Sequence, residues 1–183
     1  MLTHEVDIAF SPQSRVGSLA VSDDGKIIAW SESDQSVNIL VEMGKAQKIP
    51  IESDAKGIFL QDNNLIYADD DFGVKCVDTS GETIWQCEIP GGVSLLKKCK
   101  DFIAVVDNLG RLSTLSHQGN SLKSFHQFTS IIMISPYSNG VIVVLESGSV
   151  HFFDGQHSVW NRPARGEVGE SITNVGLTAE NKL

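Results

Sequence analysis

GIFLQDNNLIYADDDFGVKCVDTSGETIWQCEIPGG, residues 57–92, contains four short apolar runs separated by polar residues. The runs cover residues 58–60, 65–68, 74–77 and 84–89. Asp, Asn, Ser and Gly fill the gaps between them, and these residue types favour tight turns. Short runs joined by turns predict the strands of one small antiparallel sheet. Because such a sheet cannot bury its own faces, we expect the pattern to recur along the chain.

The pattern recurs with a period of roughly forty residues. The first residues of the second strands are, in order, Ile27, Leu65, Phe102, Val141 and Leu183, which gives spacings of 38, 37, 39 and 42 residues by subtraction. The position after the first four of these is always isoleucine. A period of about forty residues with four short strands is the pattern of β-propeller blades. The sequence therefore predicts an all-β protein, a β-propeller built of four-stranded antiparallel blades.

About four blades and the start of a fifth are predicted. The four blades cover about residues 16–50, 55–90, 93–128 and 130–163. The fifth begins at about residue 171, because residues 172–183 repeat the apolar spacing that opens the first blade. Residues 5–10 alternate polar and apolar side chains, as a strand ahead of the first blade would. We expect residues 1–183 to form a single propeller domain or a segment of a larger ring, with a closed four-bladed ring as the alternative.

The composition limits the classes of partner. Hydrophobic residues make up 41% of the chain and charged residues 20%, as in ordinary globular proteins. The 23 acidic and 14 basic residues give a net charge of -9, which repels phosphate backbones, so we expect no nucleic-acid partner. The longest wholly apolar run, residues 141–145, is far too short to cross a membrane, and no membrane partner is expected.

The cysteines and the amino terminus predict a cytoplasmic location. Three cysteines, Cys76, Cys87 and Cys99, are a small, odd number that favours a reducing compartment. Residues 1–5 lack both the basic start and the apolar core of a secretory signal. We expect buried free thiols. The alternative is a disulfide between Cys76 and Cys87, which would be diagonal neighbours in one hairpin and poorly placed for a bond.

The segment GVKCVDTSGETIW, residues 73–85, resembles the repeats of pyrroloquinoline-quinone-like propellers. Their signature is an Asp, a short turn with Gly, and a Trp four residues later. Two places match it: Asp78, Gly81 and Trp85, and, with a shorter turn, Asp154, Gly155 and Trp160. The first repeat, with VSDDGKI at residues 21–27, resembles WD-repeat propellers but lacks their Trp-Asp ending. The resemblance implies membership of this propeller-repeat superfamily, with the tryptophans packed between neighbouring blades.

An acidic residue stands four positions after each aligned isoleucine: Glu32, Asp70, Asp107 and Glu146. If the blades pack radially, these carboxylates fall at equivalent turns on one rim of the ring. Such a rim would attract a basic partner or a cation. The alternative is that each carboxylate only ends its strand and keeps the edge soluble.

No motif in the sequence carries catalysis or binds a cofactor. Asp69-Asp70-Asp71 does not fit a calcium-binding loop, and it predicts a solvated turn. The five histidines show no metal-ligand spacing, and the phosphate-binding, dinucleotide and nucleophile-elbow motifs are absent. We therefore expect no catalytic, cofactor-binding or metal-binding residues and no cofactor.

The predicted function is a non-catalytic protein–protein interaction scaffold, as in WD-repeat proteins. The alternative implied by the resemblance is a quinoprotein-like oxidoreductase that depends on pyrroloquinoline quinone and calcium, or a cofactor-free relative of one. A purely structural module within a larger protein is the third reading. Open strand edges at the end blades also predict self-association.

Overall fold

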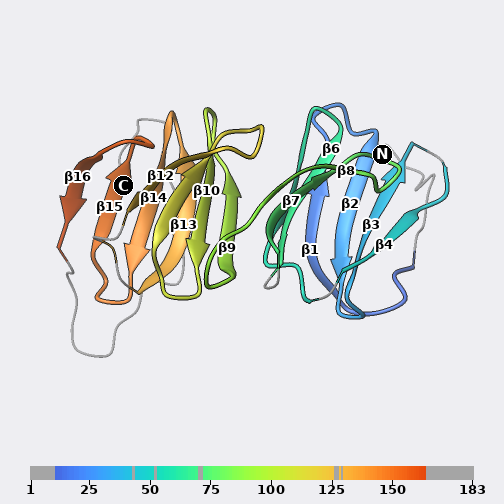
Figure 1. The fold of residues 1–183 in the computed structure, drawn as a ribbon, viewed down its shortest axis with the longest axis horizontal. Helices are drawn as coiled ribbons and strands as arrows, with labels where there is room; N and C mark the ends of the chain where they lie inside the picture. The colour runs from blue at the N-terminus through green and yellow to red at the C-terminus, as the bar shows by residue number, and fades with distance from the viewer. Residues whose placement is uncertain are drawn as a thin grey trace, which may run out of the picture. The chain divides into compact units, whose positions relative to one another are not determined.

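In the computed structural model the chain is all β. The structure describes residues 11–42, 44–51, 53–69, 72–125, 128 and 130–163. Within these residues sixteen strands form four antiparallel sheets of four strands, each paired in chain order (Figure 1). The predicted fourfold repetition of a four-stranded antiparallel sheet is thus confirmed. The predicted strand at residues 5–10 and the start of a fifth blade lie outside the described residues.

The sixteen strands have the following bounds. The first sheet contains β1 (Val16–Val21), β2 (Ile27–Glu32), β3 (Ser36–Val41) and β4 (Gln47–Pro50). The second contains β5 (Ile58–Gln61), β6 (Asn64–Asp69), β7 (Gly73–Val77) and β8 (Thr83–Cys87). The third contains β9 (Val93–Lys98), β10 (Ile103–Asp107), β11 (Leu112–Leu115) and β12 (Ser121–Phe125). The fourth contains β13 (Ile131–Tyr137), β14 (Gly140–Leu145), β15 (Val150–Phe153) and β16 (Ser158–Arg162).

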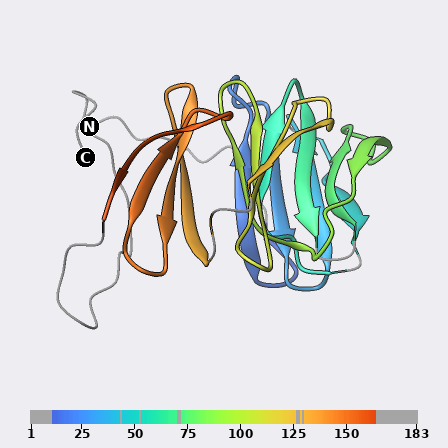
Figure 2. The same cartoon turned by 60° about the vertical axis from the view of Figure 1, so that its left-hand side comes forward.

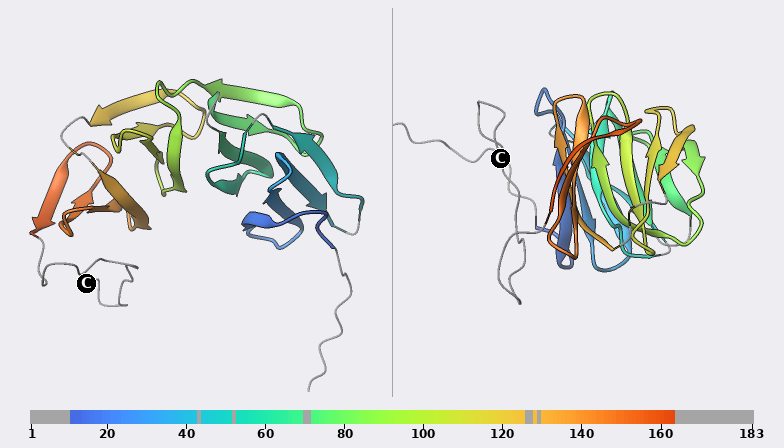
Figure 3. Two further views of the ribbon diagram at one scale, coloured as in Figure 1. Left: turned by 90° about the horizontal axis from the view of Figure 1, so that it is seen from below. Right: turned by 90° about the vertical axis from the view of Figure 1, so that its left-hand side faces the viewer.

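The chain divides into two compact units, Met1–Gln86 (unit 1) and Cys87–Leu183 (unit 2), with the boundary at the end of β8. Unit 1 contains the sheets β1–β4 and β5–β8, and unit 2 contains β9–β12 and β13–β16. Within each unit the two sheets lie face to face (Figure 3). Each sheet is a simple meander, which the turned view shows for β13–β16 in orange to red (Figure 2). The prediction of a single domain over residues 1–183 stays a prediction.

Alternating side chains build the core of unit 1. Ile27 and Ala29 of β2 and Val37 and Ile39 of β3 point toward the second sheet. They meet Leu60, Leu65, Tyr67 and Val77 there. Because side chains alternate across a strand, one face of the first sheet is committed to this core.

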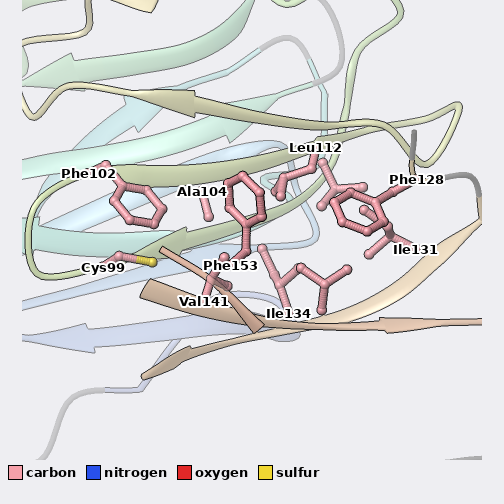
Figure 4. Close-up of a cluster of buried hydrophobic side chains, with 11 residues drawn as sticks. Cys99, Phe102, Ala104, Leu112, Phe128, Ile131, Ile134, Val141 and Phe153 are labelled. Carbon is pink, nitrogen blue, oxygen red and sulfur yellow. The ribbon is translucent and has the colours of Figure 1, made fainter. Parts of the chain in front are cut away.

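The core of unit 2 is centred on Phe153 of β15, which is fully buried (Figure 4). Figure 4 shows Phe102 on one side of this ring and Leu112 and Phe128 on the other. The rings of Phe128 and Phe153 meet edge to face, with centroids 6.2 Å apart. Apolar side chains of β10 and β11 thus pack against those of β13, β14 and β15.

The Asp-Gly signature residues form repeated turns between third and fourth strands. A carboxylate oxygen of Asp78 accepts the backbone N–H groups of Ser80 and Glu82, at 2.8 and 3.0 Å. Asp154 does the same for Gln156 and His157, at 2.8 and 2.7 Å. Such turns satisfy backbone donors locally, which is the physical reason for Asp in the motif.

The signature glycines have a packing role. Gly81 and Gly155 both have left-handed φ angles, 89° and 92°. A Cβ on Gly81 would lie 3.2 Å from Ile49 of the first sheet, and one on Gly155 would lie 2.8 Å from the Phe102 ring. Each glycine therefore lets a turn approach the neighbouring sheet of its own unit.

The tryptophan of the fourth sheet packs within that sheet. Trp160 is half-buried, and its ring stacks on Phe152 with centroids 6.1 Å apart and planes at 29°. Tyr137 meets Phe152 edge on, at 5.4 Å. The contact described for Trp160 is thus with its own sheet, whereas the resemblance implies packing between blades.

Candidate interaction rim

The second and third strands of each sheet close at an equivalent pair of residues, and these pairs revise the alignment of the acidic residues. Three residues separate the members of each closing pair. The pairs are Glu32 with Ser36, Asp69 with Gly73, Asp107 with Arg111, and Leu145 with Ser149. Glu146 therefore belongs to its turn, one position after the closing residue Leu145, whereas Glu32 and Asp107 are themselves closing residues. In the second sheet the closing residue is Asp69, and Asp70 lies outside the described residues. The closing residue follows the aligned isoleucine by four positions in β2 and β10, but by three positions in β6 and β14. The acidic residues aligned in the sequence therefore do not occupy equivalent positions.

Glu32 of unit 1 is buried, with 4% of its surface exposed. One carboxylate oxygen accepts the Trp30 indole N–H at 2.7 Å and the Asn38 amide at 3.3 Å. The other accepts the backbone N–H groups of Gln13 and Ser14, at 3.1 and 3.0 Å, and the Ser14 hydroxyl at 3.2 Å. The Trp30 hydrogen bond lowers the pKa of Glu32, in spite of the burial that opposes it, so the group is charged at neutral pH.

Glu32 also lies between two surface cavities of unit 1. One, of about 300 Å³, is lined by Arg15, Glu32, Asp54 and Lys56 among others. The second, of about 420 Å³, is lined by Glu32, Asn38, Lys45 and Lys48 among others. Both have charged side chains of both signs, and Lys48 is already paired with Asp34. The five donors of Glu32 come from its own unit, so its carboxylate holds the chain entering β1 against the sheet.

Asp107 of unit 2 fixes the turn between β10 and β11. It is 6% exposed, and one carboxylate oxygen accepts the backbone N–H groups of Leu109 and Arg111, both at 2.9 Å. The other accepts the Arg111 Nε–H at 2.6 Å. The backbone adds two bonds, from Asp107 N to the Arg111 carbonyl and from Gly110 N to the Asp107 carbonyl. The turn is therefore held by five hydrogen bonds.

This turn presents Leu109 to solvent. Its backbone N–H points inward to Asp107, whereas its side chain is 65% exposed. Gly110 has φ 73°, and a Cβ there would lie 2.6 Å from the backbone nitrogen of Ser130. The turn therefore packs directly on the backbone that leads into β13.

The turn after β14 lies against the same residue. The Glu146 N–H donates to the Ser130 carbonyl at 2.9 Å, and the Glu146 side chain is exposed. Ser130 is also exposed and has a left-handed φ of 58°. The two turns thus flank Ser130. We call Leu109, Arg111, Ser130 and Glu146 the unit 2 rim patch.

The four predicted rim residues have different environments. Glu32 is buried in unit 1, Asp107 is buried in unit 2, Glu146 is exposed in unit 2, and Asp70 lies outside the described residues. Asp69 takes the closing position and accepts the Phe72 N–H at 2.7 Å. The sequence analysis missed Leu109 and Ser130. An apolar residue between the turn formers Asn108 and Gly110 was the signal for Leu109, whereas Ser130 has no sequence signal.

The reactive side chains are largely enclosed. Cys76 and Cys99 are buried free thiols, and burial raises their pKa values to about 11 and about 12. Cys87 is a half-buried free thiol. His151 contacts the Ser149 hydroxyl at 3.3 Å, and burial lowers its pKa. In the part of the chain that the structure describes, no group of three or more His, Cys, Asp or Glu residues is arranged to hold a metal ion, and no helix is long and apolar enough to cross a membrane.

Comparison with known proteins supports the fold. The sequence matches no protein-family model and no curated protein. Among solved structures it is similar to the computationally designed Ika4 protein, with a TM-score of 0.66 and 16% identity over 83% of this chain and 98% of that chain. It is also similar to the WD40 β-propeller domain of Doa1, with a TM-score of 0.65 and 11% identity over 82% of this chain and 55% of that chain.

A third similar structure is the computationally designed Ika8 protein, with a TM-score of 0.63 and 18% identity over 78% of this chain and 46% of that chain. The chain thus spans about half the length of the Doa1 domain and of Ika8. At these identities the likeness shows the fold alone, which is that of β-propeller repeats. The predicted fold class is confirmed.

Proposed function

We propose that this chain is a non-catalytic scaffold that binds a protein partner through the turns of its rim. The observation that carries the proposal is the exposed Leu109 on a turn fixed by the buried Asp107. Because the backbone of this turn is already fixed, a partner that covers Leu109 does not have to order the turn, and the entropy cost of binding is smaller. Interaction surfaces gain most of their binding energy from a few such anchors.

The fold supports the proposal in general terms. A WD40 propeller domain is among the similar structures, and propellers display their turns on two rims. Since one fold serves many functions, the specific support for partner binding comes from the turns themselves. In the described residues the buried carboxylates and thiols are engaged in hydrogen bonds or packing, whereas the turn side chains Leu109 and Glu146 face solvent.

The charge of the chain favours a basic partner. The net charge is -9, and the predicted acidic rim of Glu32, Asp70, Asp107 and Glu146 would add to the attraction. Glu32 and Asp107 contribute by fixing local structure, since their oxygens accept internal donors. Glu146 is the member of the set that is exposed in the described residues. A cytoplasmic location remains part of this proposal.

The quinone-dependent oxidoreductase is the rival, and the Asp-Gly-Trp motif is its support. In the structure Asp78 and Asp154 accept backbone donors of their own turns. Pyrroloquinoline quinone added with calcium raises the melting temperature of the full chain if this alternative holds. No shift in melting temperature is the result expected for the scaffold.

The scaffold is tested by partner binding to the full chain. A protein that copurifies with the tagged chain is identified, purified alone and titrated against it by calorimetry. We expect saturable binding that Asp70→Lys and Glu146→Lys weaken without lowering the melting temperature. A chain with no saturable protein partner, or binding that neither substitution affects, would contradict the proposed rim scaffold.

A further inference from the structure

We infer that the unit 2 rim patch recognises a protein segment in which an apolar side chain stands beside a lysine or arginine. This inference rests on the proposed scaffold function and names the chemistry of the partner at one site. It is built on the described residues of unit 2 alone: Leu109, Arg111, Ser130 and Glu146.

The apolar half of the patch is Leu109. It is 65% exposed at the tip of a turn, and it is the most exposed of the large hydrophobic residues in the described chain. Its turn cannot fold back to hide it, because the Leu109 and Arg111 N–H groups and the Arg111 guanidinium are all bound to the buried Asp107. An apolar side chain of a partner would remove this surface from water.

The charged half of the patch is Glu146. Its backbone N–H is fixed on the Ser130 carbonyl, but its carboxylate is exposed and forms no hydrogen bond or ion pair among the described residues. The other charged member of the patch, Arg111, lies 2.6 Å from the Asp107 carboxylate, which neutralises it. The patch therefore presents one uncompensated negative charge beside one apolar side chain.

Ser130 sets the spacing of the two halves. Gly110 packs against its backbone nitrogen, and Glu146 donates to its carbonyl, so the two turns are joined through one residue. Because both turns contact this one residue, we expect a single partner segment to reach both halves of the patch. An acidic segment is disfavoured, because Glu146 and the net charge of -9 both repel it.

The test is selection of peptides on the full chain from a random phage-displayed library. All peptides enriched on the full chain are synthesised with a fluorophore and titrated by anisotropy against the chain and against its Leu109→Ala/Glu146→Lys double variant. We expect the bound sequences to share Lys or Arg next to Leu, Ile, Phe or Met. Leu109→Ala should weaken binding about tenfold, which corresponds to about 1.4 kcal/mol.

Charge reversal distinguishes specific binding at the unit 2 rim patch from nonspecific binding to the chain. Glu146→Lys should weaken the selected peptides at least about tenfold, and replacing the peptide's basic residue by Glu should restore binding to that variant. Leu122→Ala and Asp101→Lys are the matched controls. Both residues are exposed in unit 2 outside the patch, and neither substitution should change affinity.

Three outcomes are distinguishable. Basic-apolar peptides that depend on both Leu109 and Glu146 support the inference. Peptides that bind the chain but are acidic, or are indifferent to Leu109 and Glu146, overturn the inference while the scaffold function stands. A chain that yields no specific peptide and has no saturable native partner overturns both.

Discussion

Substitution of Glu32 tests whether the buried carboxylate is structural. Glu32→Ala removes the acceptor of the Trp30 indole N–H and of the Asn38 amide, and it releases Gln13 and Ser14 from the sheet. Trp30 and Asn38 are buried, so water does not readily replace the lost acceptor. Glu32→Gln keeps one amide oxygen for Trp30 but turns an NH₂ group toward the backbone donors of Gln13 and Ser14.

The magnitude follows from the donors left without an acceptor. A buried donor that loses its partner costs about 1–3 kcal/mol. The Trp30 indole N–H loses its acceptor at 2.7 Å, and Asn38 bears only part of the cost because the Ser36 hydroxyl lies 3.3 Å away. We therefore expect Glu32→Ala to lower the free energy of unfolding by about 3 kcal/mol and Glu32→Gln by about 1–2 kcal/mol.

The assay is urea unfolding of the full chain, followed by the fluorescence of Trp30 after replacement of Trp85 and Trp160 by Phe. The pKa of Glu32 is lowered in the folded state, so its contribution is present above the unfolded pKa of about 4.3 and is lost as the pH falls through the folded pKa. The stability gap between the parent chain and its Glu32→Gln variant should therefore be full at pH 7 and shrink below about pH 4.3.

Glu146→Ala is the matched control, since Glu146 is exposed on a turn, and it should change stability by less than about 0.5 kcal/mol. Glu32→Ala that is no more destabilising than Glu146→Ala would refute the structural role. A stability gap between the parent chain and the Glu32→Gln variant that does not depend on pH would refute the assigned charge.

Three further predictions follow from the turns and the thiols. In the third sheet Ser116 takes the place of Asp78 and Asp154, and its hydroxyl accepts the Gln118 and Asn120 N–H groups at 3.2 and 3.1 Å. Ser116→Asp should therefore stabilise the chain by about 0.5–1 kcal/mol, measured by calorimetry, and a lower melting temperature would contradict this. Gly155→Ala should lower the free energy of unfolding by about 2–3 kcal/mol, because both the left-handed φ and the Phe102 ring oppose a Cβ. The control Gly25→Ala, at φ 73° with open space around it, should lower the free energy of unfolding by only about 1 kcal/mol, and equal losses would refute the packing role of Gly155. Burial raises the pKa values of Cys76 and Cys99 to about 11 and about 12, so their contribution to the free energy of unfolding is complete below about pH 8.5. Above that pH each thiol loses about 1.4 kcal/mol of this contribution per pH unit until its folded pKa is reached. Cys99→Ala should reduce the alkaline loss of stability in urea titrations, and an unchanged loss would contradict the assignment.

Much of the fold was predictable because it repeats. The buried second strands β2, β6, β10 and β14 recur at a nearly constant period, and their apolar runs are bounded by turn residues. The Asp78 and Asp154 turns were also readable, since side-chain capping of a turn is a local interaction. Local chemistry and periodicity thus define the sheets.

The candidate site was only partly predictable. Asp107 closes its strand, whereas Glu146 lies one position after the closing residue Leu145, so the two do not occupy equivalent positions. The closing position depends on how the strands pair and not on composition. Burial of Glu32 and Asp107 arises from donors such as Ser14, Trp30 and Arg111, whose positions the sequence does not show. The exposure of Leu109 is decided by the same tertiary detail.

Hydrogen exchange of the full chain, measured with and without its native partner, shows whether the partner binds the rim turns. We expect binding to slow exchange in the two rim turns, residues 108–111 and 146–149, and in residues 130–131, which both turns contact. Exchange in the turn at residues 99–102, which joins β9 to β10, should stay unchanged. Protection confined to other segments, with both rim turns exchanging as in the free chain, would contradict the proposed interaction rim.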